Sequence, residues 1–239
     1  MIYMVGDIHG DIDIRNLTKS IPNNGRGLTK ADYIFCVGDF GLVFSPTQTP
    51  TEKYWLDWLD KKPYTTIFID GNHDNHPRIW SDEFEVVEMF GGDVIQISKS
   101  VFYLFRSTIY NIQGKTFLCM GGATSIDKLQ RTEGIDWWST EEPNYMSWKF
   151  LFETVAENPV VDYVVTHDVP ACVYDDLQEL WGAGDYYKDA NSSVPKGLQE
   201  LYNQVTFKHW FAGHHHIDQT FHKDKGPVTI LYEESFAVE

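Results

Sequence analysis

The sequence predicts an α/β fold in which strands and helices alternate along a single domain, residues 1–239. Two observations predict it: short β-branched or aromatic runs recur along the 239 residues, and amphipathic patterns lie between several of them. Apolar runs of this length are typical of strands that helices bury on both faces. A chain of this length has room for one such layered domain.

The runs that predict strands mostly end in Gly, Asp, Asn or His. They are Ile2–Val5, Tyr33–Val37, Thr65–Ile69, Val101–Phe105, Thr116–Met120, Tyr163–Thr166, His209–Ala212 and Val228–Tyr232. In folds of this class, polar side chains at the carboxyl ends of strands gather in one crevice. We therefore expect the residues that follow these runs to form the functional site.

Helical patterns lie between the predicted strands. The first helix is expected to be capped by Asp11 or Asp13 and to end at residues 22–25, which contain proline and glycine. The others are Glu52–Leu59, Trp148–Val155 and Lys196–Val205, each of which places apolar residues on one face.

The charge balance limits the classes of partner. A formal net charge of −16 repels polyphosphate backbones at long range, so extended DNA or RNA is not expected as a main partner. A small phosphate-ester substrate remains compatible, because bound metal ions reverse the field inside a cleft. The oligomeric state has no signal in the sequence.

Neither membrane insertion nor disulfide bonding is predicted. The N-terminus enters a strand without a basic region or a long apolar region, and no apolar run reaches the ~20 residues of a membrane span. We therefore expect a soluble, cytoplasmic protein. Cys36, Cys119 and Cys172 are far apart and lie in or beside apolar runs, which predicts buried free thiols.

Metal-ligating side chains follow the first two strands. Asp7 and His9 come directly after the first strand and, in an extended chain, point to the same side, as two ligands of one ion require. Asp39 follows the second strand, after Gly38, which permits a sharp turn. A carboxylate has two oxygens and can bridge two cations. Each pattern alone is also compatible with an ordinary turn.

The third and fourth strands are followed by residues that suit proton transfer as well as metal binding. Asn72 offers a neutral oxygen to a metal, His73 can donate a proton, and Asp74 can orient and charge-stabilise the His73 imidazole. His167 supplies another imidazole directly after Tyr163–Thr166.

The run Gly213-His214-His215-His216 is the strongest local signal, because it follows an apolar strand inside the chain. Alternate residues His214 and His216 are expected to face one way, with His215 turned outward. Carboxylates, imidazoles and an amide oxygen without a thiolate favour Mn, Fe or Zn ions. Two such ions ~3.5–4 Å apart activate water and stabilise the charge that spreads over a transferring phosphoryl group.

Taken in order, these clusters resemble the five motifs of the calcineurin-like metallophosphoesterases. The matching residues are Asp7-x-His9, Gly38-Asp39, Gly71-Asn72-His73-Asp74, His167 and Gly213-His214-x-His216, which together span residues 7–216. The resemblance implies a four-layer fold, with two mixed β-sheets flanked by helices and the metal site at the carboxyl ends of strands.

The resemblance also implies roles for these residues. The first metal would be bound by Asp7, His9, Asp39 and His216, and the second by Asp39, Asn72, His167 and His214. A hydroxide bridging the two ions would attack the phosphorus of a phosphodiester or a small phosphomonoester. His73 would act as general acid or electrostatic stabiliser, and Asp74 would orient it.

Two departures bear on the substrate. The opening resembles the Ser/Thr protein phosphatases and the bacterial dinucleoside-tetraphosphatases, but Gly38-Asp39-Phe40-Gly41-Leu42 lacks the arginine with which those enzymes bind phosphate. The motif Gly71-Asn72-His73-Asp74 also ends in aspartate, where those families usually have glutamate. This argues against a protein phosphatase. The segment Gly121-Gly122-Ala123-Thr124-Ser125-Ile126-Asp127, with Arg131 and Trp137-Trp138, looks instead like small bacterial and phage metallophosphoesterases.

Two further features concern substrate binding. Arg131 is a candidate to bind phosphate oxygens, since a guanidinium does so bidentately. A plain surface arginine and an internal partner for Asp127 are equal alternatives. Residues 171–200, rich in Tyr, Trp, Asp and Gly, are a candidate rim or lid that sets substrate choice.

Two other functions are compatible with the same fold. A non-catalytic protein-binding scaffold is disfavoured because His73 and every ligand position are present. A DNA nuclease is disfavoured because such enzymes carry basic patches or added DNA-binding domains. A net charge of −16 argues against a basic patch, and a length of 239 residues leaves no room for an added domain.

Overall fold

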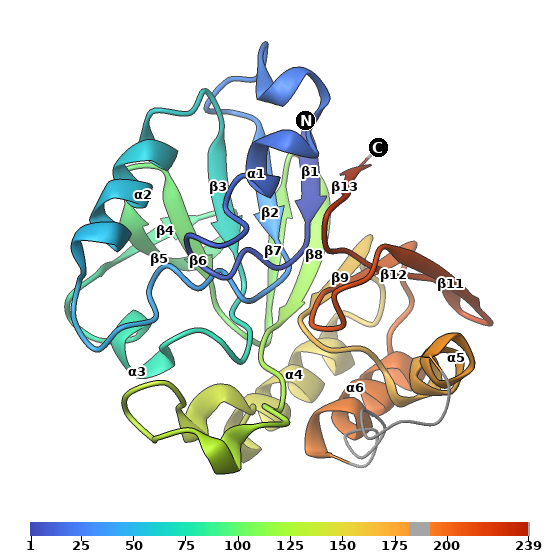
Figure 1. The fold of residues 1–239 in the computed structure, drawn as a ribbon. Helices are drawn as coiled ribbons and strands as arrows, with labels where there is room; N and C mark the ends of the chain where they lie inside the picture. Colours follow the sequence, from blue (N-terminus) through green and yellow to red (C-terminus); the bar gives the residue numbers. More distant parts are fainter. Residues whose placement is uncertain (182–191, 239) are drawn as a thin grey trace.

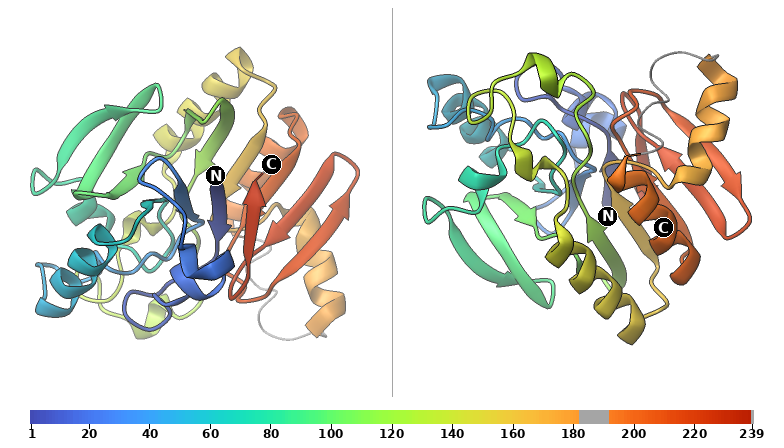
Figure 2. Two further views of the ribbon diagram at one scale, coloured as in Figure 1. Left: turned by 90° about the horizontal axis from the view of Figure 1, so that it is seen from above. Right: turned by 90° about the horizontal axis from the view of Figure 1, so that it is seen from below.

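The computed structural model describes residues 1–181 and 192–238, in which two mixed β-sheets pack face to face with helices outside them (Figures 1 and 2). The first sheet has the order β13-β1-β2-β3-β6-β5-β4. Its strands are β1 (Ile2–Val5), β2 (Tyr33–Cys36), β3 (Thr65–Phe68), β4 (Glu85–Met89), β5 (Gly92–Ser98), β6 (Val101–Leu104) and β13 (Ser235–Val238). Strands β1, β2, β3 and β6 run parallel to one another, and the outer strands are antiparallel.

The second sheet has the order β11-β12-β10-β9-β8-β7. Its strands are β7 (Thr108–Ile112), β8 (Lys115–Met120), β9 (Tyr163–Thr166), β10 (His209–Ala212), β11 (Gln219–Lys223) and β12 (Gly226–Ile230). Again the central strands β8, β9, β10 and β12 are parallel, and the edge strands are antiparallel.

Helices cover the outer face of each sheet. Their bounds are α1 (Asn16–Lys19), α2 (Pro50–Asp60), α3 (His76–Ile79), α4 (Tyr145–Glu157), α5 (Ala171–Trp181) and α6 (Ser193–Gln204). Leu56 and Leu59 of α2 pack on the first sheet, whereas α4, α5 and α6 pack on the second. No helix among the described residues combines the length and the apolar character that crossing a membrane requires.

The alternation of side chains along each strand explains the four layers. In β1, Ile2 and Met4 point into the core between the two sheets, whereas Tyr3 and Val5 point into the core beneath the helices. All four side chains are buried. A strand that is buried on both faces needs apolar residues at successive positions, so the apolar runs predicted these central strands and the α/β sandwich is confirmed.

Several expectations about local structure need correction. Neither Asp11 nor Asp13 caps the first helix: α1 starts only after Arg15, without a side-chain cap, because the preceding chain turns at His9 and Gly10. Cys36 and Cys119 are free and buried as expected, but Cys172 is only partly buried.

The proposed rim or lid covers residues 171–200, of which the structure describes two parts. Residues 171–181 form α5 and residues 193–200 belong to α6, while residues 182–191 lie outside the described residues. Leu180 of α5 borders a pocket that also contains His216. The effect of this segment on substrate choice stays a prediction.

Candidate metal centre

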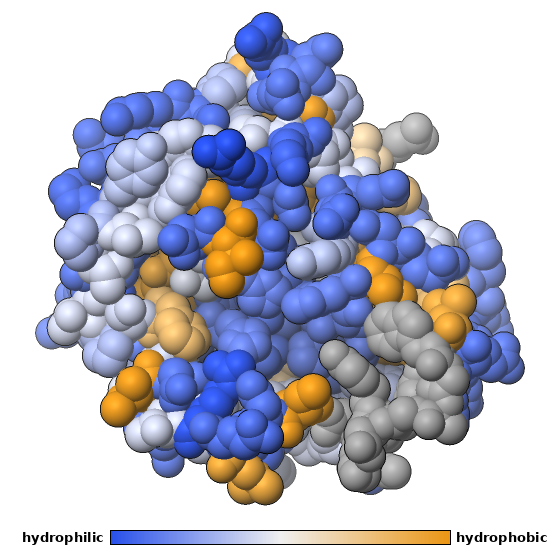
Figure 3. Space-filling view, viewed as in Figure 1, coloured by the Kyte–Doolittle hydropathy of each residue, from blue (hydrophilic) through white to orange (hydrophobic). Residues whose placement is uncertain are grey.

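The candidate site lies where β1, β2 and β3 of the first sheet and β9 and β10 of the second end. Hydrophilic side chains form a hollow at the centre of this face, and hydrophobic side chains border it (Figure 3). The loops after these strands carry the predicted ligands, which are Asp7, His9, Asp39, Asn72, His167, His214 and His216. The fold therefore brings together residues that are up to about two hundred positions apart in the chain.

Asp39 lies at the middle of the cluster. Its Oδ2 atom is 3.3 Å from Nε2 of His9, and its Oδ1 atom is 3.3 Å from Nε2 of His167. The two oxygens of one buried carboxylate thus face imidazoles on opposite sides. A carboxylate placed in this way has an oxygen available to a cation on each side.

The residues on one side of Asp39 form a first group. Asp7, His9 and His216 each offer a ligand atom, and these atoms lie within 4.8 Å of one another. Oδ2 of Asp7 is 3.3 Å from Nε2 of His216, whose ring stacks on that of Tyr232 with centroids 4.6 Å apart. Nδ1 of His9 lies 3.6 Å from the Asp13 carboxylate, a second contact that orients the ligand imidazole.

A second group, which shares Asp7 with the first, surrounds His167. Asp7, Asp39 and His167 also offer ligand atoms within 4.8 Å of one another. The amide oxygen of Asn72 is 3.2 Å from Nε2 of His167, and the ring centroid of His214 is 5.1 Å from that of His167. The backbone carbonyl of Val37 lies 3.0 Å from Nδ1 of His167, which leaves Nε2 free to face Asp39 and Asn72.

Glycines allow the strand ends to approach this closely. A Cβ atom on Gly71 would lie 2.1 Å from Oδ1 of Asp39, and one on Gly38 would lie 2.1 Å from Nδ1 of His167. Gly38 also has a φ of 112°, which other residues rarely adopt. A side chain on Gly71 would therefore displace the Asp39 carboxylate, and one on Gly38 would displace the His167 imidazole.

Four of the predicted ligands have a left-handed backbone. The φ angles are 48° at His9, 45° at Asp39, 66° at His214 and 50° at His216. Each such conformation of a non-glycine residue costs on the order of 1 kcal/mol or more. The surrounding structure holds these residues in strained turns that aim their side chains inward.

The electrostatics of the cluster favour positive charge. Burial would lower the pKa of His167, yet the negative charges of Asp39 and Asp7 raise it to about 10. Burial would raise the pKa of Asp39, but its contacts with His167 and His9 hold it well below its usual value. Two buried carboxylates that attract a proton this strongly also attract cations, so the residues present fit a pair of divalent metal ions.

His73 lies beside the ligands. Its backbone N–H donates to Oδ1 of Asp39 at 2.7 Å, and its ring centroid is 5.6 Å from that of His9. Burial lowers the pKa of His73, as does the positive charge of Arg131, against the opposing charge of Asp39. The imidazole is therefore close enough to the centre to act on a bound substrate.

The expectation that Asp74 orients His73 is wrong. Asp74 is fully buried, and its carboxylate accepts backbone N–H groups of Gly41 at 2.8 Å, Gly71 at 2.8 Å and Phe40 at 3.2 Å. Burial, followed by the charge of Asp39, raises its pKa to about 7. Asp74 joins the loops after β2 and β3 instead of contacting the imidazole of its neighbour.

His215 also differs from the expectation that it turns outward. Its side chain is only 6% exposed, and Nε2 lies 3.2 Å from Oδ1 of Asp168. The Tyr174 hydroxyl donates to the same carboxylate at 3.0 Å. His215 therefore fastens the loop that carries His214 and His216 to the end of β9.

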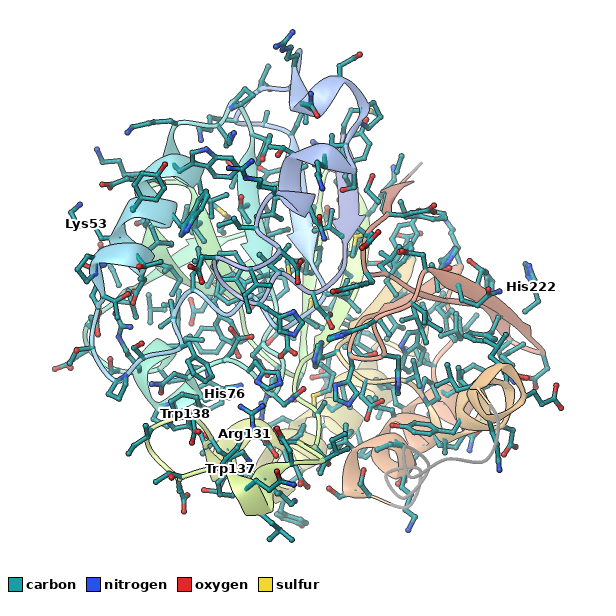
Figure 4. All side chains as sticks on the ribbon, in the orientation of Figure 1. Lys53, His76, Arg131, Trp137, Trp138 and His222 are labelled. Carbon is teal, nitrogen blue, oxygen red and sulfur yellow. The ribbon has the colours of Figure 1, made fainter. Side chains whose placement is uncertain are left out.

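Arg131 pairs with Asp127, the alternative that the sequence left open. Its Nε atom donates to Oδ1 of Asp127 at 2.7 Å, and Nη1 donates to the carbonyl of Asp136 at 3.1 Å. Figure 4 shows Arg131 in the same part of the molecule as Trp137 and Trp138. Because its charge acts on His73, Arg131 stays a candidate for binding phosphate.

Ser125 and Glu141 belong to the site but were not predicted. The side-chain amide of Asn72 donates to Oγ of Ser125 at 3.1 Å. Ser125 in turn donates through Oγ to Glu141 at 2.5 Å and through its backbone N–H at 2.9 Å. With its nitrogen held this way, Asn72 turns its amide oxygen toward His167. The only signal in the sequence was the Gly121–Asp127 segment that carries Ser125.

A buried ion pair that was also missed supports this arrangement. Asp70, at the end of β3, is fully buried and accepts from Arg106 at 2.7 Å, with Nε2 of His76 also at 2.7 Å. Arg106 donates further to the carbonyl of Glu141 at 2.8 Å. The pair thereby joins β3 to the segment that holds Ser125.

Replacing Ser125 with alanine is expected to weaken metal binding 10- to 100-fold, as typically follows loss of a group that orients a ligand. The amide of Asn72 would lose the acceptor that fixes its orientation. Calorimetric titration with Mn²⁺ measures the affinity, and Ser193→Ala, which removes an exposed hydrogen bond to Glu142, is the matched control. Unchanged affinity in Ser125→Ala would show that Asn72 is oriented without it.

Known proteins resemble this chain in sequence and fold. A model of the family described as calcineurin-like phosphoesterase matches residues 1–218. A lariat debranching enzyme of Entamoeba histolytica is 20% identical over 96% of this chain and 67% of its own length. A lariat debranching enzyme of Schizosaccharomyces pombe is 26% identical over 67% of this chain and 35% of its own length, so the chain spans only part of each relative.

A solved structure, GAP50, the anchor in the inner membrane complex of Plasmodium, shares the fold with a TM-score of 0.50. It is 11% identical, and the match covers 97% of this chain and 70% of that protein. At this identity the similarity concerns the fold alone. The family match, by contrast, covers residues 1–218 and includes every cluster at the strand ends. This protein therefore belongs to the calcineurin-like phosphoesterase family.

Proposed function

We propose that this protein hydrolyses a phosphodiester or a small phosphomonoester with the help of two bound metal ions. Manganese is one of the metals that suit the ligands. The observation that carries the proposal is the placement of Asp39, whose two oxygens lie 3.3 Å from His9 on one side and 3.3 Å from His167 on the other. Two cations bound here would activate a water molecule and offset the charge that develops on the phosphoryl oxygens.

The residues of the site would have different roles in metal binding, proton transfer and substrate binding. Asp7, His9 and His216 would hold one cation, Asn72, His167 and His214 would hold the other, and Asp39 would be shared between them. His73 lies beside Asp39 and belongs to neither of these two ligand sets, although its ring is close enough to His9 and Asp39 to share a cation with them. We assign it to proton donation to the leaving oxygen or to stabilisation of its charge. Arg131 contributes a positive charge near His73, which favours an anionic substrate.

Chelation followed by reconstitution tests the proposal. The metal-free protein is expected to lose hydrolysis of nitrophenyl phosphodiesters and monoesters, and Mn²⁺ is expected to restore it. Faster diester cleavage would direct a wider screen to diesters, including a lariat substrate because two relatives are lariat debranching enzymes. Faster monoester cleavage would direct it to small phosphomonoesters. Absence of metal-dependent turnover of either ester would favour a non-catalytic scaffold.

A further inference from the structure

We propose that a pocket beside the metal centre binds the leaving alcohol of the ester and selects an uncharged, ring-sized apolar group. The pocket has a volume of about 260 Å³, and both His9 and His73 line it. The inference rests on the proposed function, because His73 would protonate the leaving oxygen. An alcohol whose oxygen faces His73 must place its carbon atoms in the space next to that imidazole.

The wall of this pocket is apolar. Ile12, Leu42 and Phe44 line it. Ile12 is 78% exposed although it is a large aliphatic residue, and Phe44 packs edge-on against Trp138 with ring centroids 5.0 Å apart. Covering Ile12 with an apolar ligand group would remove its exposed surface from water, which favours binding.

Away from the two imidazoles at the metal centre, the pocket lining has no cationic side chain that would bind a further phosphate. None of its lining residues is lysine or arginine. Its buried acid, Glu52, is held by the guanidinium of Arg78 at 2.7 and 2.8 Å, so that its charge is compensated within the wall. Asp11, at the exposed rim, would repel an anion. These charges select an uncharged leaving group.

The pocket is preformed and fixed relative to His73. The backbone N–H of Asn75, two residues after His73, donates to the carbonyl of Val43 at 3.0 Å, and its side chain donates to the carbonyl of Phe44 at 3.2 Å. Arg78 donates to the carbonyl of Ser45 at 3.1 Å. The loop after β2, which forms the apolar wall, is thereby fastened to the segment that carries the proton donor.

The volume of the pocket suits a small occupant. Pockets for drug-sized ligands span roughly 300–1,000 Å³. A pocket of about 260 Å³ is smaller and accommodates one ring better than an extended chain. Phe44 presents an aromatic surface to such a ring.

Binding of two phosphonates, which cannot be hydrolysed, tests the pocket directly. Calorimetry on the Mn²⁺-loaded protein should give phenylphosphonate about tenfold higher affinity than methylphosphonate, as expected for filling an apolar pocket. Ile12→Ser and Phe44→Ala should each reduce this preference without changing the affinity for methylphosphonate. Val160→Ser is the control, because Val160 is 68% exposed and lies outside the pocket.

The outcomes separate this inference from the proposed function. Equal affinities for the two phosphonates in the unmodified protein would overturn the proposal that this pocket binds a ring. A preference for phenylphosphonate that survives both substitutions would overturn it as well. Hydrolysis of phenyl phosphate, a monoester, and of a nitrophenyl phosphodiester is measured in parallel. Absence of turnover of both esters at every Mn²⁺ concentration would overturn the proposed hydrolysis, whereas the comparison of the two phosphonates would still decide whether the pocket binds a ring.

Discussion

Replacing Asp39 with alanine is expected to empty both metal positions and to lower turnover by about 10³-fold or more. The metals supply several kcal/mol of transition-state stabilisation, and each 1.36 kcal/mol corresponds to a factor of ten in rate. Removing Asp39 takes a contact from both His9 and His167, which face its two oxygens. Elemental analysis of desalted protein measures the metal content, and the nitrophenyl ester assay measures turnover.

Asp57→Ala is the matched control for this substitution. Asp57 lies on α2, is 53% exposed and pairs with Lys53 on the same helix. Its loss should leave metal content and turnover unchanged, since an exposed pair contributes at most ~1 kcal/mol to stability. Two equivalents of tightly bound metal in Asp39→Ala would show that this carboxylate does not bridge the ions.

Replacing His73 with alanine is expected to leave the metals in place and to lower turnover by about 10²–10⁴-fold, the usual contribution of a general acid. His73 lies outside both ligand groups but only 5.6 Å, between ring centroids, from His9. The loss should be larger for an alkyl ester than for a nitrophenyl ester, because nitrophenolate departs without a proton. Rates on both esters, together with metal content, check the prediction.

His222→Ala provides the control, since His222 is exposed on β11 and lies far from the candidate metal centre (Figure 4). Full activity of His73→Ala on the alkyl ester would exclude it as the acid. Loss of metal from His73→Ala would instead make it a ligand, as its position with His9 and Asp39 also permits.

The central strands were predictable because burial on two faces leaves an unbroken apolar run. The strands that were not predicted, β4, β5, β7, β11 and β13, are antiparallel and mostly lie toward the edges of the sheets. In β4, most side chains are exposed or only partly buried, and Val86 is 55% exposed. Edge strands contain polar residues and are joined by short turns, so their sequences lack the continuous apolar run that marks a central strand.

The ligand residues were predictable for a different reason. Each follows a strand, and parallel strands bring their carboxyl ends to one edge. The contacts that orient the ligands depend on packing between distant segments, which local spacing does not encode. Ser125 is 53 positions from Asn72, and Arg106 is 36 positions from Asp70. Asp74 was misassigned because nearby backbone N–H groups compete successfully for a buried carboxylate.

The left-handed turns at His9, Asp39, His214 and His216 have a consequence for the fate of the chain under mutation. Glycine would relieve the strain at each of these positions, so stability is given up there for the placement of the four side chains. A search for stabilising substitutions would therefore be expected to select glycine at these positions. The resulting protein would fold more stably and lose its candidate ligands.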